Sequence, residues 1–483
     1  MPVSPARAAA FEILLRIETT DAYASEMLHA SRFGKLSPSD HGLLTELVMG
    51  VLRWRSLVDN KIAERSSQAI RKLDVEVITA LRLGAYQILF LDRVPRHAAV
   101  NESVELVKGA HKRSAAGLVN AVLRKIERAA FDLDDGFSHP EWLVERWARI
   151  YGLEAARKIR EYDQAAPRQA VCVEIAQSNV ETTVPGCLRA AGPFRPAPMD
   201  SATRASRAVF DGQPGTAVPT RVWDELEGEG VLLELGKLLS TAFTVKSGDI
   251  TATQAFRERR VMIQDEGSQL VALLVGHGKK ILDCCAAPGG KTRILAERNP
   301  EATVVAMDLH PQRAALLKKL VTAGNVRVVA GDVRKMPVGG EFGRVLVDAP
   351  CSGTGTLARN PEIKWRLKPE DLLRLQEYQV EILRAAMQQV SPGGRIIYST
   401  CSLEAEENSE VVEKALAGER SFHLVDCGSV LDDLRASGEL IWDGDSLVSG
   451  PYLRTIPGVH PCDGFFAAVV TRGVTGKSRE SSG

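Results

Sequence analysis

A chain of 483 residues is longer than one ordinary hydrophobic core supports, so two or three domains are expected. Its 45% hydrophobic and 25% charged residues are typical of a soluble globular protein, and its eight irregularly spaced cysteines do not form a disulfide framework. Glu12 and Arg16 interrupt the apolar residues that follow Ser4, which excludes a signal peptide and a membrane span there. The expected compartment is the reducing cytoplasm.

The first part of the chain reads as helical. Ser4 and Pro5 are typical of a helix start, and Val77, Leu81, Gly84 and Ile88 share one helical face. Because few residues favour strands, we expect an all-α domain over residues 1–135. Residues 53–128 carry 15 Lys and Arg against eight Asp and Glu, although the whole chain has a net charge of zero. This excess indicates a polyanion-binding domain, and an ordinary solvated helical face is an equally good explanation from charge alone.

The middle of the chain has weaker patterns. A helical stretch from about Pro140 to Tyr162 is followed by strand-like pieces, AVCVEI and FTVKSG, with Pro- and Gly-rich segments between them. We expect residues 136–260 to form a helical linker and a small α+β region with a loose insertion.

From Val261 onward, apolar runs alternate with stretches of helical period. Five runs predict strands: KILDCC, TVVAMD, VRVVAGD, RVLVDAP and RIIYSTC. Apolar strands that alternate with helices indicate a parallel sheet covered on both faces, so residues 261–475 should form an α/β Rossmann-like domain. The Gly- and Ser-rich residues 476–483 are expected to be a disordered tail.

Four of these runs carry an aspartate at or near their carboxyl end: Asp283, Asp308, Asp332 and Asp348. Ligands of open α/β sheets bind beyond the carboxyl ends of the strands, so these acids should converge on one crevice. The first leads into DCCAAPGGKT, a glycine-rich turn before a helix. These residues argue against a P-loop, because Cys285 stands where that motif needs glycine and Pro288 lacks a backbone N–H.

The acids suit S-adenosylmethionine (AdoMet) as the cofactor. Asp308 is placed to accept hydrogen bonds from ribose hydroxyls, Asp332 to meet the adenine amino group, and Asp348 to pair with the methionine amino group. The competing interpretation is that each aspartate caps the helix after it.

Two cysteines, Cys351 and Cys401, close apolar strands and open polar turns that should face the same crevice. No spacing typical of a metal site occurs, so no metal is expected. A thiolate added at C6 of a pyrimidine makes C5 nucleophilic enough to accept a methyl group. An acid or a lysine, such as Asp348 or Lys291, would stabilise the charge that develops on the ring.

At these residues the chain resembles the RNA cytosine-5 methyltransferases of the Nop2/Sun group. DCCAAPGGKT, DAPCSGTG and YSTCS match motifs of that family, as do IQDEGSQL (Ile263–Leu270) and CDGFF (Cys462–Phe466). The resemblance implies that Cys401 attacks the base and that Cys351 assists product release. With Asp348 and Lys291, which we expect to stabilise charge on the ring, these form the predicted catalytic site. The implied cofactor site comprises Cys285, Ala286, Ala287, Pro288, Gly289, Gly290, Lys291, Asp308, Asp332 and Asp348.

The helical front resembles the NusB-like RNA-binding domain of the bacterial Sun/RsmB proteins, through RVPRHAAVNESVELVK and GLVNAVLRKI. This resemblance implies 16S rRNA, naked or partly assembled, as the substrate. We further expect a monomer that binds neither DNA nor membranes. The chain departs from the family pattern at Arg259 (usually Gly), Gly343 (usually Asp) and Ser409 (usually Glu).

Three alternatives remain beside this hypothesis. A tRNA or other RNA target is disfavoured by the NusB-like front. A DNA cytosine methyltransferase would have its nucleophile in a PCQ motif, where this chain has PCS. An inactive RNA-binding scaffold would be expected to lose one of Cys401, Asp308 or Asp348, and all three are present.

Overall fold

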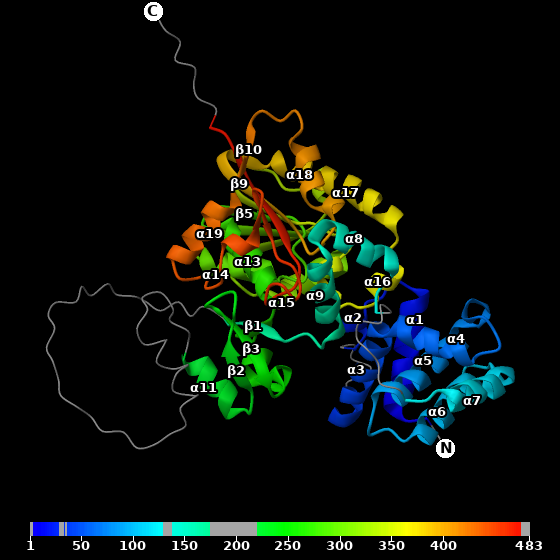
Figure 1. Ribbon diagram of the computed structural model, residues 1–483. Helices are drawn as coiled ribbons and strands as arrows, with labels where there is room; N and C mark the ends of the chain where they lie inside the picture. The colour runs from blue at the N-terminus through cyan, green and yellow to red at the C-terminus, as the bar shows by residue number, and fades with distance from the viewer. Residues whose placement is uncertain (1–2, 29–32, 34–35, 129–137, 174–219, 475–483) are drawn as a thin grey trace, which may run out of the picture.

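The computed structural model describes residues 3–28, 33, 36–128, 138–173 and 220–474 (Figure 1). The predicted disordered tail and most of the predicted loose insertion lie outside these residues. No helix among those described is long and apolar enough to cross a membrane.

The N-terminal part is helical, as the sequence predicts. Its helices are α1 (Pro5–Thr19), α2 (Ala24–Leu28), α3 (Pro38–Arg53), α4 (Arg55–Arg65), α5 (Val75–Phe90), α6 (Arg96–Gly109) and α7 (Ala116–Lys125). Helix α5 lies at the centre and is buried without interruption from Val77 to Leu89. Gly84 lets α6 and α7 approach it closely, because a Cβ at this position would come within 2.5 Å of Leu123 and 2.6 Å of the Ser103 hydroxyl.

The middle part consists of two helices and a small sheet. Helices α8 (Glu141–Tyr151) and α9 (Leu153–Gln164) form the predicted helical stretch. The four-stranded antiparallel sheet has the order β2-β3-β1-β4, and α11 and α12 accompany it. The bounds are β1 (Ala170–Val173), α11 (Thr220–Gly228), β2 (Leu232–Leu235), β3 (Ala242–Ser247), α12 (Gln254–Arg257) and β4 (Val261–Ile263).

The C-terminal part contains a nine-stranded sheet in which the five predicted strands are parallel neighbours, in the order β7-β6-β5-β8-β9. Strand β13 adds antiparallel to β9, and β10 and β12 both pair with β13. The bounds are β5 (Lys280–Asp283), β6 (Thr303–Asp308), β7 (Val326–Ala330), β8 (Phe342–Asp348), β9 (Val390–Thr400), β10 (Phe422–Val425), β11 (Val448–Ser449), β12 (Tyr452–Arg454) and β13 (Phe466–Arg472).

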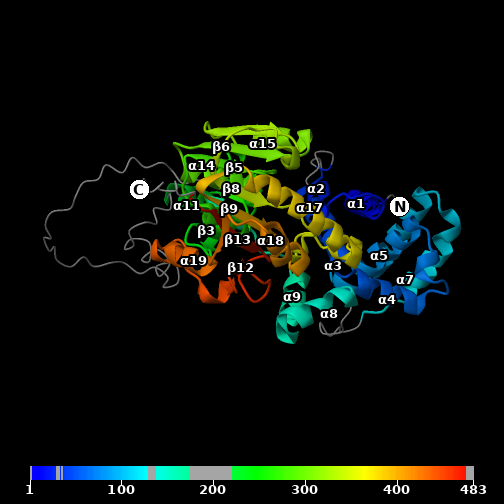
Figure 2. The same ribbon diagram turned by 90° about the horizontal axis from the view of Figure 1, so that it is seen from above.

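Helices cover both faces of this sheet, as Figure 2 shows from above. Neighbouring strand residues alternate between the two faces: Ile281 packs with one set of helices and Leu282 with the other. The first set is α13 (Glu266–Val275), α14 (Gly290–Arg298), α15 (Pro311–Leu320) and α19 (Cys427–Ala436), and the second is α17 (Pro369–Met387) and α18 (Ser409–Leu416). The chain order reverses between β5 and β8, which is where open α/β sheets bind ligands.

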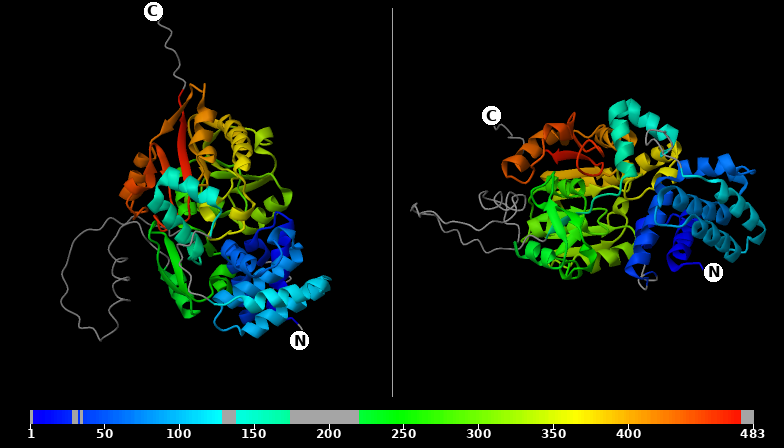
Figure 3. Two further views of the ribbon diagram at one scale, coloured as in Figure 1. Left: turned by 45° about the vertical axis from the view of Figure 1, so that its right-hand side comes forward. Right: turned by 60° about the horizontal axis from the view of Figure 1, so that its bottom comes forward.

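The N-terminal helices and the α8–α9 pair both lie beside the carboxyl-end loops of the large sheet (Figure 3). Leu143 and Trp147 of α8 and Ile159 of α9 form one buried cluster with Leu357 and Leu403. Those two leucines follow the two cysteine motifs in the chain, so α8 and α9 pack directly beneath the loops that carry Cys351 and Cys401.

Candidate active site

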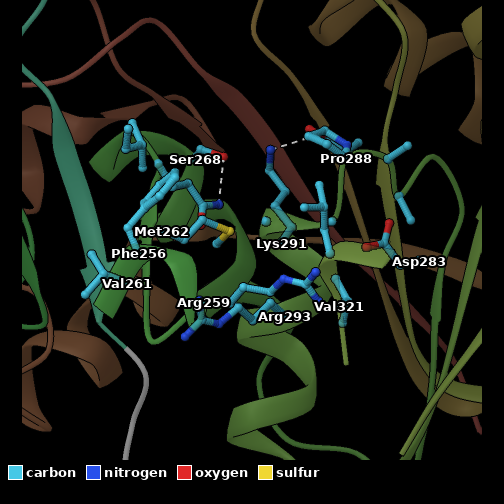
Figure 4. Close-up of a pocket in the computed structure, with 18 of the residues that line it drawn as sticks. Phe256, Arg259, Val261, Met262, Ser268, Asp283, Pro288, Lys291, Arg293 and Val321 are labelled. Atoms are coloured by element: carbon cyan, nitrogen blue, oxygen red, sulfur yellow. Dashed lines mark hydrogen bonds and ion pairs between the residues drawn. The ribbon is translucent and has the colours of Figure 1, made fainter. Parts of the chain in front are cut away.

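A cavity of about 600 Å³ opens at the carboxyl ends of β5 and β8. Phe256, Arg259, Val261 and Met262 line one side of it, and the turn that joins β5 to α14 lines the other (Figure 4). This volume is within the range of sites for nucleoside-sized ligands. The cavity therefore lies where the strand order reverses between β5 and β8, and all of the predicted cofactor residues from Cys285 to Lys291 line it.

Two glycines shape the turn beside the cavity. Gly289 has φ of 118°, a conformation that L side chains rarely adopt, and a Cβ there would lie 2.6 Å from Val321. A Cβ on Gly290 would lie 3.1 Å from the amide carbon of Gln264. The glycines let the first turn of α14 approach β4 and α15, so its backbone N–H groups border the cavity.

Two buried acceptors that line the cavity have no hydrogen-bond partner among the described residues. They are Oδ1 of Asp283 and Oε1 of Gln264. The other oxygen of Asp283 accepts a 2.7 Å hydrogen bond from the Thr292 hydroxyl. Buried acceptors are rarely left unpaired, so these two atoms favour a ligand that brings N–H or O–H donors. AdoMet, with its ammonium and ribose hydroxyls, meets that requirement.

The pKa of Asp283 is raised from 3.8 to about 7, mainly by burial and in addition by the charges of Asp348 and Asp308; the hydrogen bond from Thr292 and the charge of Lys291 oppose this rise. The folded protein therefore binds a proton here between pH 4 and 7 that the unfolded chain does not. The contribution of Asp283 to stability falls as pH rises through this window and is lost above about pH 7.

We predict that Asp283→Asn, which imitates the protonated acid, unfolds at higher denaturant concentration than wild type at pH 8 and at equal concentration at pH 4. The difference at pH 8 should be on the order of a few kcal/mol. Urea unfolding across this pH range measures it. The exposed cap Asp249→Asn serves as the control and should leave the pH dependence unchanged. Parallel pH profiles of wild type and Asp283→Asn would contradict the prediction.

Asp348 joins the cavity to the strand that leads to Cys401. Its Oδ2 accepts a 2.8 Å hydrogen bond from Lys291 Nζ, and its Oδ1 accepts one of 2.8 Å from the Ser399 hydroxyl. Burial lowers the pKa of Lys291, but the pairing with Asp348 outweighs it and the pKa is raised overall. Lys291 is therefore held as a buried ammonium. Asp348 links it to Ser399, which lies two residues before Cys401 in the chain.

The two predicted thiols meet beyond this pair. The Sγ atoms of Cys351 and Cys401 lie 3.4 Å apart, and both cysteines are partly accessible. The pKa of Cys351 is raised. The main cause is the contact with Cys401, and the second is burial. Cys401 contributes to the raised pKa of Lys291, so this ammonium is close enough to stabilise negative charge on Cys401.

Glu407 was not predicted as a site residue, yet it fixes the two thiol loops to each other. Its carboxylate accepts hydrogen bonds from the backbone N–H and hydroxyl of Ser352 and from the hydroxyl of Ser402, the residues that directly follow the two cysteines. Gln379 donates a further hydrogen bond of 3.0 Å. The signal in the sequence is an acid shortly after YSTCS; Ser402 is five residues away, but Gln379 and Ser352 lie 28 and 55 residues away in the chain.

Asp308 ends β6 as predicted and Asp332 lies two residues beyond the end of β7, but neither is among the residues that line the cavity. Asp308 accepts a 3.0 Å hydrogen bond from the backbone N–H of His310, and Asp332 accepts one of 3.0 Å from that of Arg334. Arg334 also forms an ion pair with Asp332 at 2.8 Å, and this hydrogen-bonded pairing lowers the pKa of Asp332. Asp332 thus caps the short helical turn after it, whereas the cap residue of α15 is His310 and Asp308 only holds the turn before it. The assignment of the two acids to adenine and ribose stays a prediction.

Arg259, a departure from the family pattern, is also a cavity residue that the sequence did not suggest. Its φ of 63° lies in the left-handed region, which explains why the family usually has glycine here. Ser409 begins α18, and a Cβ on Gly343 would meet only the Lys280 carbonyl oxygen at 4.0 Å.

Within the described ranges, no group of three or more His, Cys, Asp or Glu side chains is arranged to hold a metal ion. The seven described cysteines are all free.

Comparison with known proteins agrees with this architecture. Residues 270–471 match a family model described as 16S rRNA methyltransferase RsmB/F, and residues 4–128 match the NusB family. A Bacillus subtilis protein named "Probable ribosomal RNA small subunit methyltransferase B" is 31% identical over 96% of this chain and 98% of its own. The Vibrio cholerae protein named ribosomal RNA small subunit methyltransferase B is 30% identical, over 96% and 97%.

Two crystal structures share the fold. That of PH0851 is 23% identical, covers 97% of this chain and 99% of its own, and has a TM-score of 0.72. That of NSun6 from Pyrococcus horikoshii with SFG is 17% identical, covers 69% and 98%, and has a TM-score of 0.51.

Proposed function

This chain belongs to the RsmB/F family of 16S rRNA methyltransferases, and we propose that it methylates C5 of a cytosine in 16S rRNA, with AdoMet as the methyl donor. The observation that carries the proposal is the pair of thiols in contact just beyond the Lys291–Asp348 ion pair. Methyltransferases that act on a ring nitrogen or a ribose oxygen have no need of a nucleophilic cysteine at this place. A pyrimidine C5 does, because the ring must first be activated at C6.

The residues that line the cavity are proposed to bind the methyl donor. The turn from Cys285 to Gly290 and the acceptors on Asp283 and Gln264 would hold AdoMet, which supplies an electrophilic methyl group when bound. We propose that Asp308 and Asp332 bind the ribose and the adenine after exchanging part of their capping contacts for the ligand.

Cys401 is the proposed nucleophile. Its thiolate adds to C6 of the cytosine, the electron pair moves to C5, and C5 takes the methyl group as the donor sulfur recovers its bonding pair. Solvent water then takes the C5 proton, the C5–H electron pair re-forms the C5=C6 double bond, and the C6–S bond breaks to release 5-methylcytosine and the Cys401 thiolate. Lys291 and Asp348 stabilise the charge on the ring, and Cys351 assists the release because its thiol touches Cys401.

The N-terminal helices are proposed to bind the RNA. Their basic excess favours phosphate contacts, which weaken as salt concentration rises. We further propose that the substrate is naked or partly assembled 16S rRNA and that the enzyme acts as a monomer.

Bisulfite sequencing of total RNA from cells with and without the gene tests the proposal. One cytosine of 16S rRNA should lose its protection in the deletion strain and regain it with the wild-type gene. Protection lost only in tRNA or in another RNA would reassign the substrate, and no change in any RNA would refute cytosine-5 chemistry.

Asp308→Ala should weaken AdoMet binding about 10- to 150-fold if the carboxylate accepts hydrogen bonds from ribose, as expected for a charged acceptor. Asp426→Ala is a matched control, because Asp426 also accepts a hydrogen bond from the backbone N–H two residues ahead of it. Calorimetry with both folded variants measures the effect. Equal affinity in the two would assign Asp308 to capping alone.

A further inference from the structure

The N-terminal helical domain reaches the loop that follows the first thiol motif. Between Ala358 and Arg366, this loop forms hydrogen bonds to the N-terminal domain at several places. Trp365 donates to the carbonyl oxygen of Leu52 at 2.6 Å, and Lys364 donates to that of Arg53 at 3.1 Å. The domain is thus attached to the catalytic loop itself.

The attachment fixes one turn of the N-terminal domain, residues 20–23, which joins α1 to α2. A single guanidinium nitrogen of Arg366 donates to the carbonyl oxygens of Ile17 and Ala22, both at 2.7 Å. On the other side of Tyr23, the backbone N–H of Ala24 donates to Glu362 at 2.8 Å. The backbone on both sides of Tyr23 is therefore held by residues that lie 11 and 15 positions after Cys351 in the sequence.

The same loop is tied to the second thiol motif. The backbone N–H of Gly355, four residues after Cys351, donates to the carbonyl oxygen of Cys401 at 2.9 Å. Glu407 joins the serines after both cysteines. Hydrogen bonds thus connect the backbone beside Tyr23 to the segment after Cys351, and connect that segment to the turn that carries Cys401.

The side chain of Tyr23 remains 41% exposed, whereas the Glu362 beside it is 1% exposed. Burial raises the pKa of the Tyr23 hydroxyl, and the charges of Cys351 and Cys401 raise it further. The hydrogen bonds described above hold Tyr23 beside the segment that follows Cys351, and an anchored but accessible aromatic ring at such a place has the properties of a stacking surface.

We propose that Tyr23 stacks on the target base and positions it for attack by the thiol, so that the N-terminal domain completes the substrate site. This inference rests on the proposed function. It gives the helical domain a role beyond phosphate binding, because the base presented to the thiols is held between a residue of that domain and the catalytic domain. Tyr23 is a positioning residue that contacts the substrate and takes no proton.

The test compares Tyr23→Ala and Tyr23→Phe in the full chain with wild type, using AdoMet and 16S rRNA. Tyr23→Ala should lower kcat/KM for RNA by about 5- to 150-fold, which corresponds to the loss of one base–aromatic stack. Tyr23→Phe keeps the ring and should retain wild-type kcat/KM. Leu153→Ala removes another exposed large side chain, 80% accessible and on α9, and should change nothing.

Two readouts separate positioning from a structural role. The AdoMet affinity and the melting temperature of Tyr23→Ala should equal those of wild type. Wild-type activity in Tyr23→Ala, an equal loss in Tyr23→Phe, or a parallel loss of AdoMet affinity would each overturn the inference. These outcomes leave the proposed function intact as long as wild type methylates the RNA, whereas an inactive wild type would refute the proposed function itself.

Discussion

Replacing Cys401 with alanine should abolish methylation of RNA and any covalent protein–RNA species. Without a thiolate at C6, the C5 position of cytosine is too weak a nucleophile to accept the methyl group at a useful rate. Since Cys401 packs against the apolar cluster of α13 and β9 only at its edge, alanine should leave AdoMet affinity and folding unchanged. Transfer of labelled methyl groups to 16S rRNA measures the activity, which should fall to background.

Cys351→Ala should behave differently from Cys401→Ala, because this substitution slows the release of the methylated base and not the attack on C6. We expect this variant to attack the base and transfer the methyl group, and then to stall before the C6–S bond breaks. The stalled species is held by a carbon–sulfur bond, so it survives denaturant and migrates slowly on a denaturing gel. The double variant Cys351→Ala/Cys401→Ala should give no such band.

A thiol outside the crevice provides the control for both variants. Cys427 is buried on α19, where its Sγ lies 3.6 Å from the carbonyl oxygen of Ala467. Cys427→Ala should methylate normally and form no stable adduct. An adduct with Cys401→Ala and none with Cys351→Ala would exchange the two roles and make DAPCSG the nucleophile motif.

Asp348→Asn should lower kcat by about 100- to 1,000-fold, the usual effect of removing one preorganised electrostatic contact at a reacting centre. Asparagine has the same size and can still accept the hydrogen bond from Ser399. It removes the charge that pairs with Lys291, so the buried ammonium loses its counter-ion. Burial then lowers the pKa of Lys291 against the smaller opposing effects of Cys401 and Asp283 alone, and the remaining activity should fall as pH rises.

Single-turnover rates from pH 6 to 9 test this prediction. Asp59→Asn is a matched control, because Asp59 forms a largely buried ion pair with Arg82 at 2.7 Å in the N-terminal domain, far along the chain from the cavity. It should lose stability and keep its single-turnover rate. An Asp348→Asn enzyme with wild-type rates would show that the Lys291–Asp348 pair serves only the fold.

The strands and the thiol pair could be predicted from the sequence because each depends on local pattern. Apolar runs ending in Asp348 or Thr400 predict parallel strands, and parallel strands bring their carboxyl ends to one edge. Cys351 and Cys401 follow those two ends, so their contact follows from the register that pairs Asp348 with Ser399.

The contributions of Glu407, Arg259 and Tyr23 could not be predicted, because they arise from tertiary packing. An acid on a turn after YSTCS is indistinguishable from a solvated one until Ser352 and Ser402 are seen to donate to it. Asp308 and Asp332 show the reverse case, since local capping and ligand binding require the same residue type at the same strand end. Only a ligand measurement separates those two roles.

The hydrogen bonds between the N-terminal domain and residues 358–366 join groups that are 305 to 349 positions apart in the chain. During synthesis the helical domain leaves the ribosome, and can fold on its own core, long before its docking segment has been translated. Docking is therefore a late event in the folding of this protein. Because contacts of such long range form slowly, the assembled substrate site should be the last part of the newly made enzyme to appear.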